Sequence, residues 1–422
     1  MSNILQMGAI TMASTRVLVL GSNFAGLTAA LETQYAFRGT GGGLDLTVLS
    51  KSDRFVFTPS QIWVPFGKRE ADDITVPLGP VMSRLGIHFV PSPATRIDRA
   101  TRMVTAANGQ VYPYDYLVIA TGFRNDFSGV PGMDPKDGFA NTITTLPEAE
   151  RTHQAWLKFI RDPGDRGIIV GAAPKAGCMG AAYEEVLNMA YQLKRIRLNK
   201  RVPLTYISGE PFLGHFGING MAGAKPAVSM FFKMTGIKPV INAAIESVSG
   251  DYLTLADGSV RPFDLAVLIP PFVGVDVVRE VEGLTDAGGY VPVDENYHSA
   301  LDPRIYAVGI AAQVTTPWVT AVALGVPKTG FPSEVQARIA ARTIAAEVLG
   351  TPAPVGKAFK DIPAICLMDA GGPPFGGAMI LGSTMFGPRK FSAIIPGPQV
   401  HLMKVLFEKY FLFKVRHGLR WQ

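Results

Sequence analysis

Cysteine is the residue type with the most reactive side chain in this sequence, and only Cys178 and Cys366 occur. Two distant cysteines form neither a C-x-x-C metal spacing nor a disulfide scaffold, and isolated cysteines are usually inert and buried. Cys178, however, directly precedes a predicted helix over 180–193. Because a helix N-terminus favours the nucleophilic thiolate and lowers the thiol pKa, we predict a reactive thiol there. The alternative is a small buried residue that fills a turn.

A glycine-rich turn, GSNFAG at 21–26, lies between an apolar β-branched run at 16–20 and a predicted helix over 26–34. Another strand is predicted at 44–49, which completes the opening unit of a dinucleotide-binding sheet. In the motif G-x-G-x-x-G, backbone N–H groups approach a pyrophosphate at a helix N-terminus. Asn23 replaces the middle glycine, and asparagine tolerates a left-handed backbone. The alternative is a glycine-rich turn in another α/β fold.

Later strand ends favour the same cofactor site. Ser50 and Lys51 follow the second strand in place of an acid, and they offer a hydroxyl for a ribose and a cation for phosphate or adenine. Thr121-Gly122 follows a predicted strand over 114–120, and Gly309-Ile310 follows one over 305–308, where Ile310 replaces the usual Asp. Three such elements in this order are typical of flavoproteins with two dinucleotide-binding domains, so we predict FAD.

A second strand-turn-helix-strand unit begins at 167–170 and continues to strands at 204–207 and 265–269. Its loop reads GAAPKAGCMG over 171–180. Ala173 and Ala176 replace glycines, and Pro174 lacks a backbone donor. We therefore predict that this loop does not bind NAD(P)H tightly.

The composition suits a folded protein of several domains. The 422 residues are 47% hydrophobic and 18% charged, which excludes a disordered chain. The net charge of +6 favours an anionic partner such as lipid; nucleic acid is a poor alternative because the basic residues are spread. We expect no secretory signal and no spanning helix, since the uncharged runs 305–327 and 370–388 are broken by Gly, Pro and Thr.

The C-terminal region differs from the rest in composition. Glycine and proline dominate 348–398, and apolar and aromatic residues recur at near-helical spacing over 400–421 among several lysines and arginines. This pattern predicts an interfacial helix on a membrane surface; a helix packed on its own core is the alternative. We divide the chain into a tail (1–15), an FAD-binding domain (16–125 and 290–347), a second nucleotide-like domain (126–289) and a C-terminal quinone and membrane segment (348–422).

Five segments resemble the sulfide:quinone oxidoreductases: 54–78, GAAPKAGCMGAAYEEV at 171–186, EPFLGHFGING at 210–220, VPKTGF at 326–331 and KVLFEKYFLFKVRHG at 404–418. The resemblance extends from about Arg16 to His417. It implies an α/β fold of two Rossmann-like, glutathione-reductase-like domains, with non-covalent FAD and no metal. It also implies a monotopic membrane enzyme that oxidises sulfide to polysulfide and reduces a membrane quinone. A homo-oligomer is compatible with the resemblance. Cys178 and Cys366 would flank the reactive edge of the flavin, hydrosulfide would attack a sulfur bridge between them, and Cys366 would form the flavin adduct.

The resemblance also implies roles for individual residues. His215 has an ordinary pKa of ~6.5, which suits proton exchange with hydrosulfide; a packed loop histidine is the alternative. Lys328 would stabilise the anionic reduced flavin. The implied FAD contacts are Gly21, Asn23, Phe24, Ala25, Gly26, Ser50, Lys51, Pro59, Ala94, Thr121, Gly122, Gly309, Ile310, Lys328 and Thr329, and the implied quinone or membrane contacts are Phe375, Phe407, Tyr410 and Phe411.

Two departures and three alternatives accompany the resemblance. Several family members carry a third cysteine and a nearby histidine where this chain has Thr144 and Glu148, so only a two-cysteine mechanism is possible. Glu184 is interpreted as part of a solvated helix face. The alternatives are a flavocytochrome c-type sulfide dehydrogenase, a type II NADH dehydrogenase, and a non-catalytic flavoprotein that binds sulfur or senses redox state.

Overall fold

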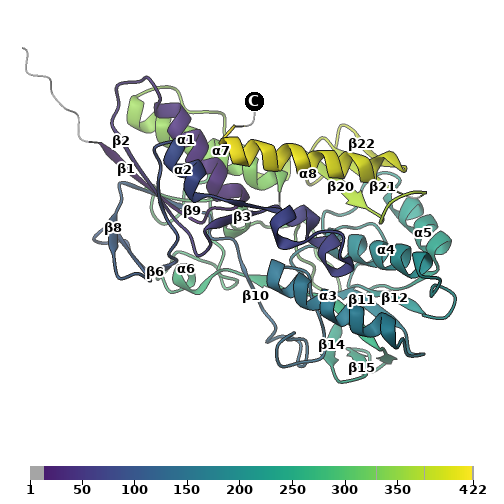
Figure 1. Cartoon of the computed structure of the whole chain (residues 1–422). Coiled ribbons are helices and arrows are strands. Elements are labelled where there is room, and N and C mark those ends of the chain that lie inside the picture. The colour runs from purple at the N-terminus through teal and green to yellow at the C-terminus, as the bar shows by residue number, and fades with distance from the viewer. Residues whose placement is uncertain (1–13, 329, 375, 421–422) are drawn as a thin grey trace, which may run out of the picture.

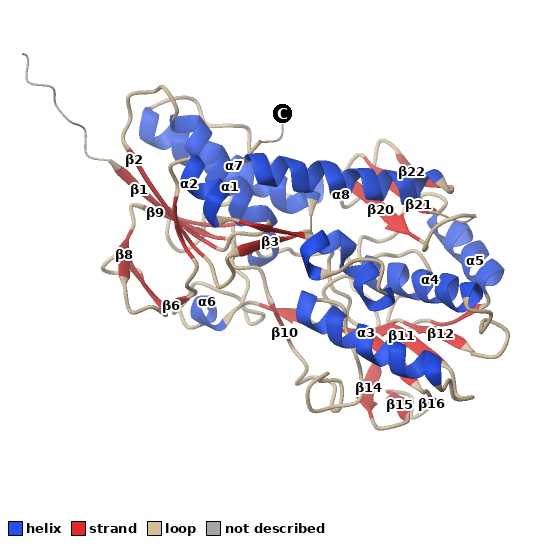
Figure 2. Cartoon of the chain, viewed as in Figure 1, coloured by secondary structure: helices blue, strands red, loops and turns tan. Residues whose placement is uncertain are grey.

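Two parallel sheets lie side by side in the computed structural model, which describes residues 14–420 except 329 and 375 (Figures 1 and 2). Residues 1–13 of the predicted tail, Thr329 and Phe375 therefore lie outside the described residues. The first sheet has the strand order β19-β9-β1-β2-β5. Its strands are β1 (Thr15–Leu20), β2 (Leu44–Leu49), β5 (His88–Val90), β9 (Tyr116–Ile119) and β19 (Ile305–Ala307).

The second sheet repeats this plan and has the order β13-β12-β11-β17. Helix α4 (Met179–Arg195) forms the crossover connection from β11 to β12. Strands predicted from buried apolar runs are confirmed here, since every residue of β11 and β17 is buried. The strands are β11 (Ile168–Ala172), β12 (Leu204–Ile207), β13 (Ile237–Val240) and β17 (Leu265–Ile269).

Each half also carries a three-stranded antiparallel sheet. One consists of β6 (Ala94–Asp98), β7 (Met103–Ala106) and β8 (Val111–Pro113). The other consists of β14 (Ile245–Val248), β15 (Tyr252–Leu255) and β16 (Val260–Pro262). Where the chain passes between the halves, β10 (Arg124–Asn125) pairs antiparallel with β18 (Phe272–Val273).

Helices cover the sheets. Helix α1 (Phe24–Phe37) packs along α7 (Phe331–Leu349), and α3 (Leu146–Arg161) packs on the 3-10 helix η1 (Thr58–Phe66). One core cluster continues from β1 through α4 to α8, so the halves share apolar packing. The remaining short elements are β3 (Arg54–Val56), η2 (Ala71–Asp73), β4 (Thr75–Pro77), α2 (Gly79–Arg84), α5 (Ala224–Thr235), α6 (Asp276–Arg279), η3 (Gly309–Ala311) and η4 (Phe359–Asp361).

The C-terminal region is more ordered than its glycine and proline content suggested. It forms a third antiparallel sheet of β20 (Ala364–Asp369), β21 (Gly377–Gly382) and β22 (Ser392–Pro396). Helix α8 (Gln399–His417) follows and lies along the top of Figure 1, from α7 at one end to this sheet at the other. Within the described part of the chain, no helix combines the length and the apolar character that crossing a bilayer requires.

Candidate active site

The predicted glycine turn is built so that side chains do not fit. Gly21 has a φ of +105°, and a Cβ there would lie 2.2 Å from the Ala120 carbonyl oxygen. A Cβ on Gly26 would lie 2.0 Å from the Gly21 carbonyl oxygen. Helix α1 begins at Phe24, directly inside the turn and two residues earlier than predicted. Asn23 caps it with a φ of −88°, so the left-handed backbone expected of Asn23 is not what this turn uses.

The residues after β2 partly match the expectation. The Ser22 hydroxyl donates a hydrogen bond to the Ser50 hydroxyl at 2.7 Å, and both residues are buried. Lys51 is exposed. Pro59 lies in the first turn of η1 and Ala94 begins β6, where it packs on a core cluster of the first sheet. The FAD contacts of Pro59 and Ala94 stay predictions.

The third cofactor element is held by a buried lysine. Gly309 has a φ of +69°, and a Cβ there would lie 2.9 Å from the Ala25 side chain. The Lys328 ammonium donates to the carbonyl oxygens of Ile310 and Ala312 at 2.9 and 3.0 Å. Burial lowers the pKa of Lys328 to about 7. The lysine is thus fixed at the strand end that carries Gly309 and Ile310.

One polar atom at this site is left for a ligand. Thr121 follows β9, and its hydroxyl oxygen is buried without a hydrogen-bond partner among the described residues. A buried polar group without a partner is costly, so such groups are normally satisfied by protein, water or ligand. The turn at Gly21 and Gly26, where only glycine fits, closes on the same strand end. These residues fit a dinucleotide such as FAD.

The two cysteines are free thiols that the fold brings near each other. Cys178 caps the N-terminus of α4, and Cys366 lies in the middle of β20 with an accessible side chain. Burial raises the pKa of Cys178, although backbone N–H groups of α4 act against it. Desolvation by the surrounding protein, with smaller effects of Glu184 and Cys178, raises the pKa of Cys366 to about 12. The predicted lowering of the Cys178 pKa is therefore wrong, because desolvation outweighs the helix N-terminus.

A buried ion pair lies beside both thiols. The Glu184 carboxylate accepts a hydrogen bond from the Lys404 ammonium and another from the Asp369 amide, the latter at 2.6 Å. Burial raises the pKa of Glu184. Lys404 lowers the pKa of each thiol and Glu184 raises it. The interpretation of Glu184 as part of a solvated face is wrong; its side chain is enclosed between α4, β20 and α8.

Asp369, at the end of β20, extends this polar cluster. It accepts hydrogen bonds from the Trp63 indole and the Gly371 amide, both at 2.9 Å, and its other oxygen lies 2.6 Å from His401 Nδ1. Burial acts to raise the pKa of Asp369, but His401, Lys404 and Trp63 together lower it to about 2. This cluster was not predicted from the sequence. Its one sequence signal is two adjacent glutamates within the otherwise apolar start of α4.

His215 is enclosed by aromatic rings. It is 1% exposed, and its ring centroid lies 5.3 Å from that of Phe212 and 5.9 Å from that of Trp318. Its Nδ1 is buried and has no hydrogen-bond partner among the residues that the structure describes. Burial lowers the pKa of His215 to about 4, so the expected value near neutrality is wrong, and the ring is neutral at pH 7.

Helix α8 buries three of its charged side chains and exposes several apolar ones. Lys404 pairs with Glu184, Glu408 with Arg69 at 2.9 Å, and Lys414 with Glu334 at 2.9 Å, and all three α8 residues are buried. Two of the lysines expected to face lipid therefore face the core. The large apolar side chains exposed on α8 are Leu402, Met403, Leu406, Tyr410 and Phe413.

The predicted quinone aromatics do not share one face. Phe407 and Phe411 contact Phe57, with centroid separations of 5.6 and 5.3 Å, and Phe411 is 2% exposed. Tyr410 is 52% exposed on the outer side. Phe375 lies outside the described residues. Phe411 therefore packs inside and Tyr410 lies outside, and the predicted quinone or membrane contacts of these aromatics stay predictions.

The position of the missing third cysteine is part of a hydrogen-bonded cluster. The Thr144 hydroxyl lies 3.0 Å from both Asn125 Oδ1 and Glu148 Oε2. Asn125 Nδ2 donates to the Glu148 carboxylate at 2.9 Å, and the Thr145 hydroxyl donates at 2.8 Å. These side chains anchor the start of α3 to β10 and offer no thiol.

The altered second glycine loop is covered by the chain itself. The Lys175 amide donates to the Ala323 carbonyl at 2.7 Å. A Cβ on Gly325 would lie 1.9 Å from the Ala176 carbonyl oxygen, and one on Gly209 would lie 2.4 Å from Val322. Backbone over 322–325 thus occupies the surface of the loop and of the end of β12, where a second dinucleotide would approach.

Comparison with known proteins agrees with this geometry. The profile of the pyridine nucleotide-disulphide oxidoreductases matches residues 15–325. A sulfide-quinone reductase of Aquifex aeolicus is 31% identical over 408 residues, which cover 95% of this chain and 91% of that protein. The crystal structure of the sulfide:quinone oxidoreductase of that bacterium superposes with a TM-score of 0.89 at 30% identity, covering 96% of this chain and 92% of that one. A Plasmodium falciparum NDH2 in complex with NADH, at TM-score 0.69 and 12% identity, shares the fold and covers 96% of both chains.

Proposed function

This chain belongs to the sulfide:quinone oxidoreductase family of the pyridine nucleotide-disulphide oxidoreductases, and we propose that Cys178 and Cys366 carry out its sulfide oxidation beside FAD. The observation that supports this assignment most strongly is that Cys178, 188 positions away in sequence, lies near enough to Cys366 to raise the pKa of its thiol. No other cysteine occurs in the sequence, so a bridge of sulfur within the chain has only these two ends.

The proposed chemistry begins with a sulfur bridge between the two cysteines. Hydrosulfide bonds to the bridge sulfur on the Cys178 side as the bond to Cys366 breaks, so Cys366 leaves with the electron pair as a thiolate. Because nucleophilicity rises with thiol pKa, a Cys366 thiolate is a strong electron donor. The outer persulfide sulfur on Cys178 then bonds to Cys366 with the release of one proton and two electrons, which restores a bridge that is one sulfur longer. FAD, when bound, would accept these two electrons and pass them to the quinone. The balance is one hydrosulfide, one quinone and one proton giving one zero-valent sulfur and one quinol, and the sulfur lengthens a polysulfide.

The buried pair Glu184–Lys404 adjusts the charge at this step. Lys404 is the cation that favours the thiolate form of both cysteines, and Glu184 opposes it. Both side chains are buried, so their effects are screened less by solvent than those of surface charges. Lys404 thus favours the departure of Cys366 as an anion. His215, neutral at pH 7, is proposed to accept or donate a proton at an imidazole nitrogen as hydrosulfide reacts.

The outer face of α8 is proposed to rest on the membrane that holds the quinone. Its exposed apolar side chains, Leu402, Leu406 and Phe413, are each more than half exposed. Lys409, Arg416 and Arg420 are exposed close to them and would meet anionic lipid headgroups. A helix that buries its ion pairs and exposes its apolar residues suits an apolar surrounding on its outer side. The enzyme is then a peripheral membrane protein.

The function is tested on the purified, yellow protein under anaerobic conditions. Sulfide should bleach the flavin absorbance, and a soluble quinone such as decylubiquinone should restore it. NADH added in place of sulfide should leave the colour unchanged. Bleaching by NADH and not by sulfide would favour the type II NADH dehydrogenase alternative, and no bleaching by either would favour a non-catalytic flavoprotein.

A further inference from the structure

A second buried carboxylate, Glu210, lies three residues after the end of β12 and is fully enclosed. Its Oε2 accepts hydrogen bonds from the hydroxyls of Tyr183, Ser208 and Tyr206 at 2.8, 2.9 and 3.1 Å. Its Oε1 accepts one from the Phe216 amide at 2.7 Å. In dinucleotide-binding folds an acid after the second strand commonly binds a ribose; here the acid points to its own chain.

The hydrogen bonds of Glu210 fix the backbone on both sides of His215. The Phe216 amide donates directly to Glu210. The Gly214 amide donates at 2.9 Å to the Tyr183 hydroxyl, which itself donates to Glu210. Phe216 has a φ of +57°, a conformation that costs energy for a side chain of this size and needs support from its surroundings. The preceding and following residues of His215 are therefore held by one carboxylate.

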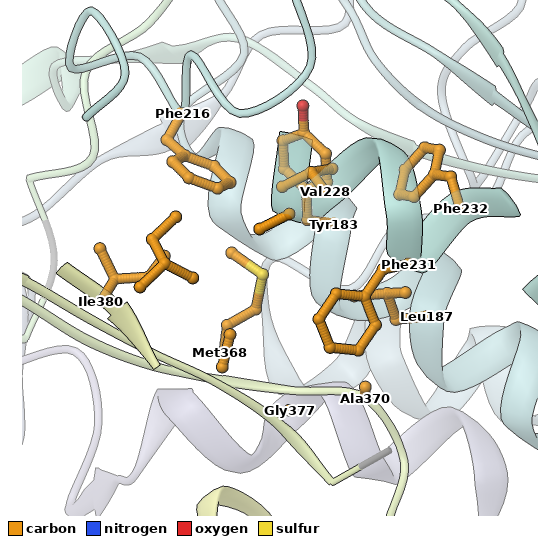
Figure 3. Close-up of a pocket in the computed structure, with 13 residues that line it drawn as sticks. Tyr183, Leu187, Phe216, Val228, Phe231, Phe232, Met368, Ala370, Gly377 and Ile380 are labelled. Carbon is orange, nitrogen blue, oxygen red and sulfur yellow. The ribbon is translucent and has the colours of Figure 1, made fainter. Parts of the chain in front are cut away.

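The same cluster contacts the elements that carry both cysteines. Tyr183 lies on α4, five residues after Cys178. Tyr183 and Phe216 line an apolar pocket together with Met368 of β20 and Ile380 of β21 (Figure 3). Ile380 is the residue that pairs with Cys366 between these two strands. In this view the Tyr183 hydroxyl points out of the pocket, away from Met368. The tyrosine thus joins a pocket lined by residues of β20 and β21 to the carboxylate of Glu210.

We propose that Glu210 is a positioning residue for sulfide oxidation, which holds His215 in a fixed place relative to the Cys178 helix and the Cys366 strand. The acid acts through the Phe216 amide and the Tyr183 hydroxyl and contacts neither sulfide nor FAD. This inference rests on the proposed role of His215. It assigns to the second dinucleotide-binding fold a function in arranging the sulfide side of the enzyme.

The test separates the two half-reactions in anaerobic stopped-flow experiments on the FAD-loaded enzyme. Glu210→Ala removes all four acceptor contacts and should slow bleaching by sulfide about tenfold or more, as expected for hydrogen bonds to a buried charge. Glu210→Gln retains one acceptor oxygen and should slow it less. Reoxidation by decylubiquinone should stay within about twofold of wild type, because the quinone side is not touched. If Glu210→Ala fails to bind FAD, Glu210→Gln decides the outcome.

A double-mutant cycle with His215→Ala distinguishes positioning from general loss of structure. Once His215 is gone, Glu210→Ala should cause no further slowing. The matched control is Glu185→Gln, a buried acid of α4 whose pKa burial raises well above its usual range; it should bleach at the wild-type rate. The inference would be overturned if the double variant bleached more slowly than His215→Ala by the factor seen for Glu210→Ala alone. It would also be overturned if Glu210→Ala slowed bleaching by sulfide and reoxidation by quinone equally. Slowing by His215→Ala with none in the Glu210 variants would overturn it too, and would leave the sulfide:quinone function intact.

Discussion

Lys404 of α8 and Glu184 of α4, 220 positions apart in sequence, form a buried ion pair that acts on both thiols. The outer surface of the same helix exposes the apolar side chains of Leu402, Leu406 and Phe413. The helix proposed to meet the membrane therefore also supplies a charge that acts on the two thiols proposed to react. Deleting the chain from Pro398 onward would remove three buried ion pairs, so point substitutions are the better test of membrane contact.

Breaking the ion pair should destabilise the enzyme. Glu184→Ala leaves the buried Lys404 ammonium without its carboxylate, and loss of one partner of a buried pair costs about 3–5 kcal/mol. Glu184→Gln combined with Lys404→Met should recover much of this loss, because no buried charge is left unpaired. Urea denaturation measures both, with the exposed Glu246→Ala as the control. Equal stability of Glu184→Ala and Glu246→Ala would contradict the assignment of a buried pair.

The raised thiol pKa has a consequence for labelling. Because the pKa of Cys366 is about 12, the thiol is protonated near neutral pH, and its thiolate fraction rises about tenfold per pH unit. After mild reduction, the rate of iodoacetamide labelling at Cys366 should therefore keep rising from pH 7 to 9. Mass spectrometry of the labelled peptide measures this rate. A plateau already reached at pH 7 would mean that the thiolate is stabilised, contrary to this description.

The outer face of α8 should determine binding to lipid. Leu406 is 59% exposed, and a leucine moved from water into an apolar phase contributes about 1.5–3 kcal/mol. Leu406→Glu should therefore weaken binding to vesicles of anionic phospholipid at least about tenfold. Val260→Glu is the matched control, since Val260 is 48% exposed on β16. Co-sedimentation in which both variants bind equally well would exclude α8 as the membrane contact.

The second glycine loop should not bind NADH tightly. Pro174 lacks a donor, and residues 322–325 lie against the loop, so a pyrophosphate has no open backbone to approach. Titration followed by flavin or protein fluorescence should show no saturation in the micromolar range. A micromolar dissociation constant would require the covering segment to move, and would contradict the proposed closed loop.

Features that depend on local pattern were predicted well from the sequence. Strands β2, β12 and β17 have the predicted limits, because each is a short apolar run bounded by turn residues. The glycine turn at 21–26 was located correctly, because the positions where a side chain would clash are marked in the sequence by glycine. The order of the three cofactor elements also follows from local signals. The family assignment rests on motifs of this kind.

Features that depend on tertiary burial were not predicted. The position of Cys178 at a helix N-terminus was correct, but the sign of its pKa change was wrong, because desolvation is invisible in the sequence. Glu184 and Lys404 each look like surface residues until the two helices pack together. The sheet β20–β22 was missed because glycine and proline conceal its strands. His215 was expected to titrate near neutrality, and aromatic packing lowers its pKa to about 4.

The central claim is that Cys178 and Cys366 act together in the reduction of the flavin by sulfide. The most direct measurement is anaerobic stopped-flow bleaching of flavin absorbance in Cys178→Ser and Cys366→Ser, each loaded with FAD and compared with wild type. Both variants should keep the oxidised flavin spectrum and lose bleaching by sulfide. Bleaching at the wild-type rate in either single variant would contradict the two-thiol account.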